Sequence, residues 1–420
     1  MTIGLNRTRL LAAVLGWLVW VPITLAQEGV VLNLPTALME ARQYQPALEA
    51  LRLERSALGY RVDTARLAPP LVLGVDLENI AGTGELRGAQ SAELTLSLSS
   101  VLELGGKADA RGAVAGAENE LRDLQLQALE RDVLGEVAIR FLDVAAAQAR
   151  LDQARHAEQL SARALSSSRV RVDAGAAPAT EVQRSRMQQE AAALDVTVAE
   201  RALSSAVDLL ALAIGNPQRP IAAVQADLET LTPLAPLEQL LGHVPQAVDV
   251  MAEGARMQVI EAQLRLAQAS ARGDLGWSVG ARHLEGSGDQ ALVAGLNFDL
   301  GAAQRAQPER RRQQGLSQAA LQEQRAAELR VRAMVAQAWA AMSNAAEEHA
   351  ALRGALQQAA DAVVAETERG YQRGRYSLLE LTAAQQEALA VRQRALNAAI
   401  AYHRIRIELE RLLGASVEGV

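Results

Sequence analysis

The sequence predicts a mainly α-helical protein with a transmembrane β-barrel part, built from two copies of one structural unit. Two very long segments rich in Ala and Gln have helical character, and aromatic residues are only 3% of the chain. Two other segments alternate apolar and polar residues on both sides of a Gly-containing loop, the pattern of a β-hairpin. Three residues recur 199 positions later without a gap: Gly175, Glu181 and Gly215 return as Gly374, Glu380 and Gly414. A shared spacing of this kind indicates an internal duplication.

The first expected element is a secretory signal peptide over residues 1–26. Two arginines precede an apolar run, residues 10–26, which ends in the small-residue cleavage pattern Thr24-Leu25-Ala26. The alternative is an uncleaved membrane anchor. No later segment has 18 consecutive apolar residues, so no second membrane helix is expected. The mature chain is therefore expected to leave the cytoplasm.

The first structural repeat is expected over residues 27–216. It begins with a helix that is interrupted at Pro46, because proline removes a backbone donor inside a helix. A β-hairpin follows at about 71–104, with leucines alternating against polar residues on each strand. A very long helix then runs to about Val172, and a further helix completes the repeat.

The second structural repeat, 240–415, is expected to have the same order of elements. Its helix precedes a hairpin at about 276–300, and its long helix runs to about Glu368 before a last helix. A proline-bearing linker, 217–239, joins the two repeats, and 416–420 form a tail. The duplication therefore predicts four strands and two long helices in each chain.

Each long helix carries a seam with alternating spacings of three and four, which predicts coiled-coil packing. The first seam is Leu134, Val137, Phe141, Val144, Gln148 and Leu151. The second is Val331, Val335, Ala338, Met342, Ala345, His349 and Leu352. Each seam has one polar member at an a position, Gln148 or His349, and a lone polar residue there can fix the register of packing.

The lengths of these elements constrain the assembly. Helices of roughly 65–70 residues reach about 100 Å at ~1.5 Å per residue, so they must pack side by side. Strands of about 9–11 residues match an apolar layer of ~25 Å when tilted. Four strands cannot close a barrel, and unpaired backbone groups cost several kcal/mol each in lipid. If the strands span a membrane, two copies would give a filled eight-stranded barrel, and three would give twelve strands with a lumen.

The inward face of the strands is expected to be polar, which favours a wet lumen. Its members are Asp76, Glu78, Glu93, Thr95, Ser97, Asn297 and Asp299. The alternative is a soluble helical protein that carries two hairpins on its surface.

Composition argues against several other functions. The net charge of −7 and the absence of a basic block with interleaved aromatics argue against nucleic-acid binding. Cysteine is absent, which excludes disulfides and thiolate metal sites. The five histidines are scattered without metal-binding spacing, and no nucleophile and base are paired. We therefore expect no enzyme activity, no cofactor and no dedicated metal site.

Helix, hairpin, very long helix and helix, repeated twice behind a signal peptide, resemble the TolC-like outer membrane efflux proteins. The resemblance covers essentially the whole mature chain. The matching stretches are "LPTALMEARQYQPALEA" followed by Pro69-Pro70, the strand exit "LSLSSVLELGGK" and the helix break "GYQRGRYSLLEL". The motif "LELGGK" is most similar to the branch that serves cation-exporting pumps of the resistance–nodulation–division (RND) class.

The resemblance implies a homotrimer in the outer membrane of a Gram-negative bacterium. Four strands from each chain would form a twelve-stranded barrel in the lipid, and the helices would continue as a tunnel across the periplasm. An inner-membrane pump and a periplasmic adaptor would dock at the lower end. The function implied is a passive, gated exit duct of a tripartite efflux system for metal cations or small toxic compounds.

Under this resemblance the glycine breaks become the helix-hairpin tips at the periplasmic end. The tip residues are Gly175, Pro178, Gly374 and Ser377. Glycine supplies the positive φ that a reversal between antiparallel helices needs.

The resemblance also implies a gate next to these tips. Glu380 would form an acidic ring at the entrance, with Glu181 as its counterpart in the first repeat. Tyr371 would bond across to Glu181 and hold the closed state. Arg373 and Arg375 are candidate salt-bridge latches, although Tyr376 stands where relatives carry a basic residue.

Glu380 also has a simpler interpretation. Ser377-x-x-Glu380 is a capping-box pattern, and an acidic residue in a first helical turn favours the helix dipole. Both roles stay open. Two other functions stay open for the whole chain: the outer duct of a type I protein-secretion system, which shares this architecture, and a periplasmic coiled-coil scaffold that does not span the membrane.

Overall fold

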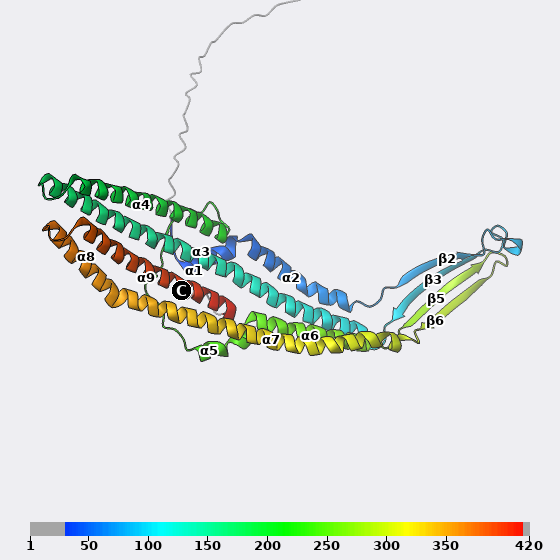
Figure 1. Ribbon diagram of the computed structural model, residues 1–420. Helices are drawn as coiled ribbons and strands as arrows, with labels where there is room; N and C mark the ends of the chain where they lie inside the picture. The colour runs from blue at the N-terminus through cyan, green and yellow to red at the C-terminus, as the bar shows by residue number, and fades with distance from the viewer. Residues whose placement is uncertain (1–29, 415–420) are drawn as a thin grey trace, which may run out of the picture.

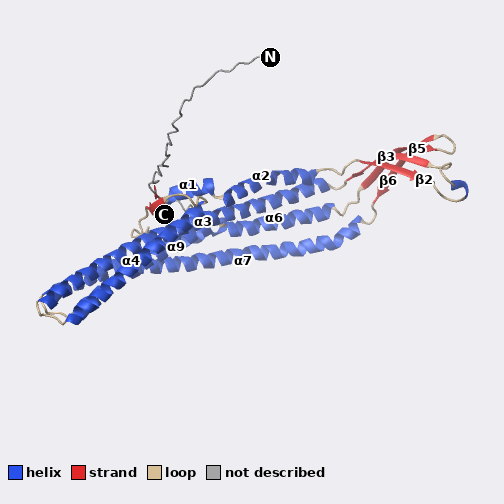
Figure 2. Cartoon of the chain, turned by 90° about the horizontal axis from the view of Figure 1, so that it is seen from above, coloured by secondary structure: helices blue, strands red, loops and turns tan. Residues whose placement is uncertain are grey.

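The protein is an elongated molecule with a β-sheet at one end and helices along the rest of its length (Figure 1). The computed structural model describes residues 30–414. The expected signal peptide, 1–26, and the tail, 416–420, lie outside the described residues. The turn between α3 and α4 and the turn between α8 and α9 both lie at the end opposite the sheet. The view from above in Figure 2 shows the same separation of strands and helical tips.

The helices of the first half include one very long rod. α1 (Leu34–Tyr44) and α2 (Pro46–Arg66) are separated at Gln45, and Pro46 occupies the first turn of α2. α3 (Lys107–Asp173) is unbroken over 67 residues, about 100 Å at ~1.5 Å per residue. α4 (Ala179–Ile214) turns back and packs along α3. These helices fix the distance between the sheet and the tips.

The second half contains α6 (Val248–Ala269), α7 (Ala302–Ala351), α8 (Gln357–Gln372) and α9 (Leu378–Leu413). The sequence analysis expected one helix to about Glu368, and here the structure differs. A π-helical turn, Leu352–Leu356, separates α7 from α8, and Gly354 within it adopts φ −78° and ψ −121°. A π turn admits an extra residue into the helix, and glycine tolerates the resulting backbone. Apolar periodicity alone does not reveal such an insertion.

The expected linker, 217–239, has more structure than its composition indicates. β4 (Ile221–Val224) pairs in parallel with β1 (Val30–Leu32), near the start of the described chain. α5 (Leu237–Gly242) begins before the linker ends, and a 3₁₀ turn, Val244–Gln246, leads into α6. This parallel pair was not predicted, because a three-residue strand gives no alternating pattern.

The two polar seam residues make backbone hydrogen bonds. The Gln148 side-chain amide donates to the carbonyl of Val224 (3.1 Å) and accepts from its N–H (2.7 Å). His349 Nδ1 lies 3.0 Å from the carbonyl oxygen of Ala395 on α9. The apolar seam members around them are mostly buried, Val137 and Val335 completely. Each polar residue therefore fixes a long helix against a neighbouring segment, in keeping with the expected register role.

The sheet joins the hairpins of the two repeats. Its strands are β2 (Val72–Glu78), β3 (Glu93–Leu102), β5 (Leu275–Leu284) and β6 (Gln290–Phe298), in the order β2-β3-β5-β6. All three pairings are antiparallel. A 3₁₀ turn, Gly84–Leu86, lies in the first hairpin loop. Within residues 30–414, β2 and β6 have no partner on their outer edges.

One face of this sheet is apolar and exposed. The large apolar side chains on it include Leu73, Val75, Leu77, Leu94, Leu96, Leu98, Val279, Leu292, Leu296 and Phe298. Val75 is 65% exposed and Leu292 is 93% exposed. An apolar surface of this extent marks an interaction with another protein or with a membrane.

An ion pair connects the two repeats where the sheet meets the helices. Lys107, the single lysine of the chain, begins α3, and its Nζ lies 2.7 Å from Oδ1 of Asp274 just before β5. The same oxygen accepts from the N–H of Leu104 at 3.1 Å. We expect Lys107→Met to lower the free energy of unfolding by about 1–3 kcal/mol, because a charged hydrogen bond is lost. Urea unfolding in detergent micelles measures the change.

The exposed ion pair between Arg61 and Glu118, 2.7 Å apart, provides the control for Lys107. Arg61→Met removes a pair that water screens, and exposed pairs contribute about 0–1 kcal/mol. Equal losses in the two variants would contradict a special role for the Lys107 pair.

A buried histidine predicts a pH-dependent stability. His403 on α9 is 4% exposed, and its Nε2 lies 3.2 Å from the carbonyl oxygen of Leu228. Burial lowers the pKa of His403 and Arg406 lowers it further, while the Leu228 carbonyl and Asp227 oppose this shift. The folded state therefore binds this proton less readily than the unfolded state. The contribution of neutral His403 to the free energy of unfolding is fully present above the unfolded pKa of about 6.5. This contribution is lost as the pH drops below that value.

We therefore expect the thermal unfolding midpoint of the wild type to decrease when the pH is lowered from 7.5 to 5.5. In His403→Gln this decrease should be smaller. Scanning calorimetry in detergent at the two pH values measures the difference. His243→Gln is the control, because His243 is exposed. An unchanged pH slope in His403→Gln would refute the assignment.

Candidate functional site

The two helix-hairpin tips have the same backbone construction. Gly175 follows the end of α3 with φ 68°, and Gly374 follows the end of α8 with φ 76°. In the first tip the N–H of Ala176 donates to the carbonyl of Arg171 (2.8 Å). In the second, the N–H of Arg375 donates to the carbonyl of Gly370, also at 2.8 Å. These bonds complete the last turn of each helix, and only glycine adopts the required φ without strain.

The following helices begin differently in the two repeats. Pro178 is the residue before α4, with φ −74° and ψ 149°, and its carbonyl accepts from the N–H of Glu181. Ser377 caps α9 in a complete capping box. The Glu380 carboxylate accepts from the N–H of Ser377 (2.7 Å) and from its hydroxyl (2.8 Å). These bonds lower the pKa of Glu380, so its carboxylate stays ionised at neutral pH. The capping role of Glu380 is therefore present in the structure.

Tyr371 joins the two tips through its hydroxyl. The hydroxyl donates to Oε2 of Glu181 at 3.0 Å, across 190 positions of sequence. It also lies 2.9 Å from the hydroxyl of Ser168, which in turn lies 2.8 Å from that of Ser185. The expected contact between Tyr371 and the first-repeat acid is thus present within one chain. The two serines were not predicted, because single serines on a helix carry no sequence signal.

Tyr371 is buried although it lies next to a turn. Its side chain is fully buried, in a cluster with Ala164, Leu378 and Leu381. Burial raises the pKa of Tyr371, and the Glu181 carboxylate raises it further. The phenol therefore stays protonated and acts as the hydrogen-bond donor at physiological pH.

Arg171, from the first repeat, also contacts Tyr371. The guanidinium carbon of Arg171 on α3 lies 4.6 Å from the ring centroid of Tyr371. Its Nη1 donates to the backbone carbonyl of Tyr371, and its Nη2 lies 3.5 Å from the carbonyl of Ala176. The sequence analysis missed Arg171, because it is one of many arginines on a helix and follows no motif.

Among the described residues, the two arginines predicted as latches form no hydrogen bond or ion pair with the first tip. Arg375 lies 3.7 Å from Glu366 on its own hairpin. In the part of the chain that the structure describes, the Arg373 side chain has no hydrogen-bond or ion-pair partner. Tyr376 packs against Gly370, where an added Cβ would lie 2.1 Å from the tyrosine ring. A latch formed by Arg373 or Arg375 remains a prediction that no contact inside the chain supports.

The polar face of the sheet brings the predicted acidic residues together around a further arginine. Arg282 on β5 lies 3.0 Å from the Glu78 carboxylate and 2.7 Å from that of Glu93, and its Nε donates to the hydroxyl of Thr95. Asp76 lies directly opposite Thr95 in the strand pairing, on the same face. Arg282 was not predicted, because its strand was assigned without its pairing register.

Two further residues of the predicted lumen, Asn297 and Asp299, lie at the β6 edge of the sheet. Asn297 on β6 is opposite Gly276 and shares the polar face. Asp299 lies one residue beyond β6. Its carboxylate pairs with Arg305 at the start of α7 and accepts from the N–H of Gly301 (3.0 Å). Asp299 therefore belongs to the junction between sheet and helix.

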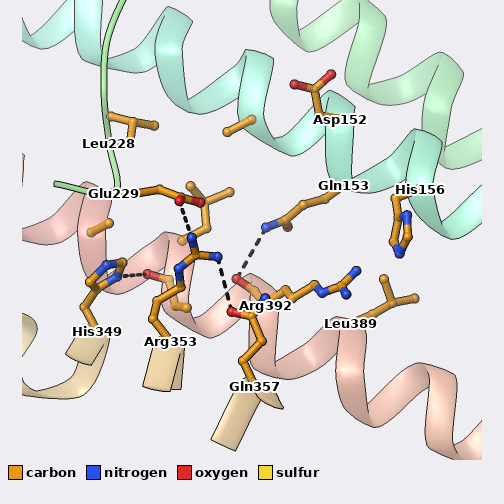
Figure 3. A pocket seen from close by; sticks show the side chains of 14 residues that line it. Asp152, Gln153, His156, Leu228, Glu229, His349, Arg353, Gln357, Leu389 and Arg392 are labelled. Atoms are coloured by element: carbon orange, nitrogen blue, oxygen red, sulfur yellow. Dashed lines mark hydrogen bonds and ion pairs between the residues drawn. The ribbon is translucent and has the colours of Figure 1, made fainter. Parts of the chain in front are cut away.

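A cavity of about 340 Å³ lies among α3, the π-helical turn and α9 (Figure 3). Its charged residues are largely paired: Arg353 binds Glu229, and Arg392 lies 2.7 Å from Asp361. His156 points into it, and burial, helped by Arg392, lowers its pKa. Over residues 30–414 no three His, Asp or Glu side chains are grouped to hold a metal ion. The cavity therefore offers no metal centre.

Solved structures share this architecture. CusC, whose crystal structures describe folding and transmembrane channel formation, superimposes with a TM-score of 0.75 at 17% identity, over 92% of this chain and 93% of CusC. The open state of the MtrE outer membrane channel of Neisseria gonorrhoeae gives a TM-score of 0.72 at 18% identity, over 91% of this chain and 88% of MtrE. The fold is that of outer membrane channel-tunnel subunits.

Sequence comparison shows similarity to one family over part of the chain. Residues 37–216 match the outer membrane efflux protein family. The cobalt-zinc-cadmium resistance protein CzcC of Cupriavidus metallidurans is 27% identical over 206 residues, which span 49% of this chain and 49% of CzcC. The match thus covers about half the length of this curated relative. Over residues 37–216 the chain is therefore similar to the outer membrane efflux proteins, and its fold is that of the outer membrane channels named above.

None of the helices in the described part of the chain combines the length and the apolar character that a membrane span needs.

Proposed function

We propose that the protein is the gated exit duct of a tripartite efflux system, formed by three copies of this chain. The observation that carries the proposal is the sheet: one face is apolar and exposed, the other is polar, and both outer edges are open. Open edges are not tolerated in lipid, because each unpaired backbone group costs several kcal/mol.

The order of the strands supports closure between identical copies. Strand directions alternate through β2, β3, β5 and β6, so β6 and β2 run in opposite directions. β6 of one copy can therefore pair antiparallel with β2 of the next. Three copies of four strands give twelve, enough for a water-filled lumen lined by residues such as Asp76, Glu78, Glu93 and Asn297. The helices would then form a tunnel in the periplasm, with the tips at its entrance.

We propose metal cations as the principal cargo, with small toxic compounds as the wider class. The similarity to CzcC supports this choice. The duct itself needs no tight metal site, because strong binding would slow release. An inner-membrane RND-type pump would supply the energy, and a periplasmic adaptor would dock the pump to the tips. No covalent chemistry is part of this function.

The same arrangement gives the gate its proposed roles. Glu181 and Tyr371 hold the two tips of one chain together, and Glu380 combines its capping role with a ring of charge at the entrance. Three carboxylates around one axis would repel each other and attract cations, which sets the charge of the constriction.

The test has two arms. Purified protein in planar lipid membranes should conduct ions and migrate as a trimer on unheated gels. A deletion strain should become sensitive to cobalt, zinc and cadmium, and the intact gene should restore resistance. A soluble periplasmic monomer without conductance would refute the duct and favour a scaffold. Unchanged metal resistance with lost secretion of a protein would favour a type I secretion duct.

A further inference from the structure

We propose that Arg171 is a positioning residue of the gate, which keeps the tunnel closed by binding the two tips of one chain at the same time. This inference rests on the proposed function. Arg171 itself belongs to the first tip, where its Nη2 approaches the carbonyl of Ala176. It reaches the second tip through both the ring and the backbone carbonyl of Tyr371. Its charge therefore ties two turns that are 200 positions apart in sequence.

The position of the Tyr371 carbonyl explains why a cation binds there. This carbonyl lies in the last turn of α8 and also accepts from the N–H of Gly374 at 3.0 Å. Carbonyls at a helix C-terminus carry the negative end of the helix dipole and attract cations. Arg171 thus binds the C-terminal end of α8 as well as the aromatic face of its side chain.

The chemistry of both contacts requires arginine. A planar guanidinium can stack on an aromatic ring while its edge donates hydrogen bonds, and a lysine ammonium cannot do both in one geometry. With its ring held by Arg171 on one face and packed among Ala164, Leu378 and Leu381, Tyr371 presents its hydroxyl to Glu181. Within residues 30–414 Arg171 makes no hydrogen bond or ion pair with Glu181, so it acts on the gate through Tyr371.

The two repeats contribute different residues to the contact among Arg171, Glu181 and Tyr371. At the 199-residue offset Arg171 corresponds to Gly370, and Val172 corresponds to Tyr371. An added Cβ at Gly370 would lie 2.1 Å from the ring of Tyr376, so a side chain there would force that ring to move. The first repeat therefore supplies the cation and the acid, and the second supplies the aromatic ring. Arg171 and Tyr371 therefore have no chemically equivalent residue in the other repeat.

Single-channel recording of the full-length protein in planar lipid membranes tests the proposal. We expect Arg171→Ala to raise the ratio of open to closed channels by about tenfold or more, because a cation–π contact and a charged hydrogen bond are both lost. Arg171→Lys should recover part of the closure. In the double variant with Tyr371→Phe, the two effects should be less than additive, because both changes act on one contact.

The matched control is Arg169→Ala, an exposed arginine two positions earlier on α3. It should conduct like the wild type. A trimer on unheated gels shows that each variant assembles, and Arg171→Gln replaces Arg171→Ala if the alanine variant does not. Opening by Arg169→Ala equal to that of Arg171→Ala would overturn the proposal.

Two further outcomes separate this inference from the proposed function. If Tyr371→Phe opens the channel and the Arg171 variants behave as the wild type, Arg171 has no positioning role, and the duct stands. If neither the wild type nor any variant conducts, the proposed duct itself fails.

Discussion

Val75→Arg is expected to reduce the amount of the proposed trimer in the outer membrane by about tenfold or more. Val75 lies in the middle of β2, on the apolar face, opposite Leu96 in the strand pairing. Its side chain is 65% exposed in the single chain, so no protein core covers it. An arginine on the lipid-facing side of a barrel costs about 2–4 kcal/mol near the bilayer midplane. The measurement is the quantity of heat-sensitive trimer in the outer membrane fraction on unheated gels.

The neighbouring residue provides a matched control for this prediction. Asp76 lies one position further on the same strand, on the polar face, opposite Thr95. Asp76→Arg introduces the same side chain, but water in the lumen would solvate it, so assembly should stay within about twofold of the wild type. Equal loss of trimer in both variants would mean that the two faces do not differ in environment. A normal amount of trimer with Val75→Arg would contradict the assignment of this face to lipid contact.

Much of the fold could be predicted, because its signals are periodic. The alternation of Leu73, Val75 and Leu77 with polar neighbours places β2 and the two faces of the sheet correctly. The seam from Leu134 to Leu151 identifies residues that are buried along α3. Strand and helix periods are local properties, so a single sequence displays them without knowledge of the tertiary contacts.

The candidate site was predictable only in part. Glu181 and Tyr371 were found through the resemblance, and Ser377 with Glu380 through a local capping pattern. The residues that hold Tyr371 in place, Ser168 and Arg171, were missed. Their contacts join segments about 200 positions apart, and neither residue type is unusual on a long helix. Contacts of this kind depend on how the two hairpins pack, and no local pattern records that packing.

Other features were missed for the same physical reason. Arg282 binds two acidic residues of the first hairpin, and this requires the β3–β5 register, which joins the repeats. The π-helical turn at Gly354 adds a residue between two stretches of helix, and the periodicity within each stretch does not reveal it. Both features belong to the tertiary structure and not to a single element.

Gly215→Ala is expected to destabilise the protein by more than about 4 kcal/mol. Gly215 ends α4 with φ 87°, a conformation that costs a residue with a Cβ about 1–2 kcal/mol. The added Cβ would also lie 2.6 Å from the carbonyl oxygen of Tyr44 and 2.7 Å from Cα of Gln45. These are backbone atoms between α1 and α2, so no side chain can move aside. Losses above 4–5 kcal/mol are exceptional for a point substitution and need a mechanism of this kind.

The surroundings of Gly215 prevent an easy adjustment. Leu210 and Ile214, in the last turns of α4, are completely buried, and so is Ala41 in α1. The Gln45 side chain donates to the carbonyl of Ala213 at 2.8 Å, which fixes the α1–α2 junction against the end of α4. To relieve the clash, both helices would have to shift in a closely packed region, and packed interiors resist such shifts.

Alanine substitutions at two other glycines of the repeats, Gly175 and Gly414, distinguish the cost of backbone strain from the cost of a steric clash. Gly175 has φ 68° and open space around an added Cβ, so Gly175→Ala should cost only the strain, about 1–2 kcal/mol. Gly414, the counterpart of Gly215, has φ 77°, and its Cβ would meet the guanidinium of Arg131, a flexible side chain. Gly414→Ala should therefore lie between the other two. Chemical unfolding of the three variants in detergent measures this order. If the free energy of unfolding lost in Gly215→Ala is no larger than that lost in Gly175→Ala, the α1–α2 junction moves to relieve the clash.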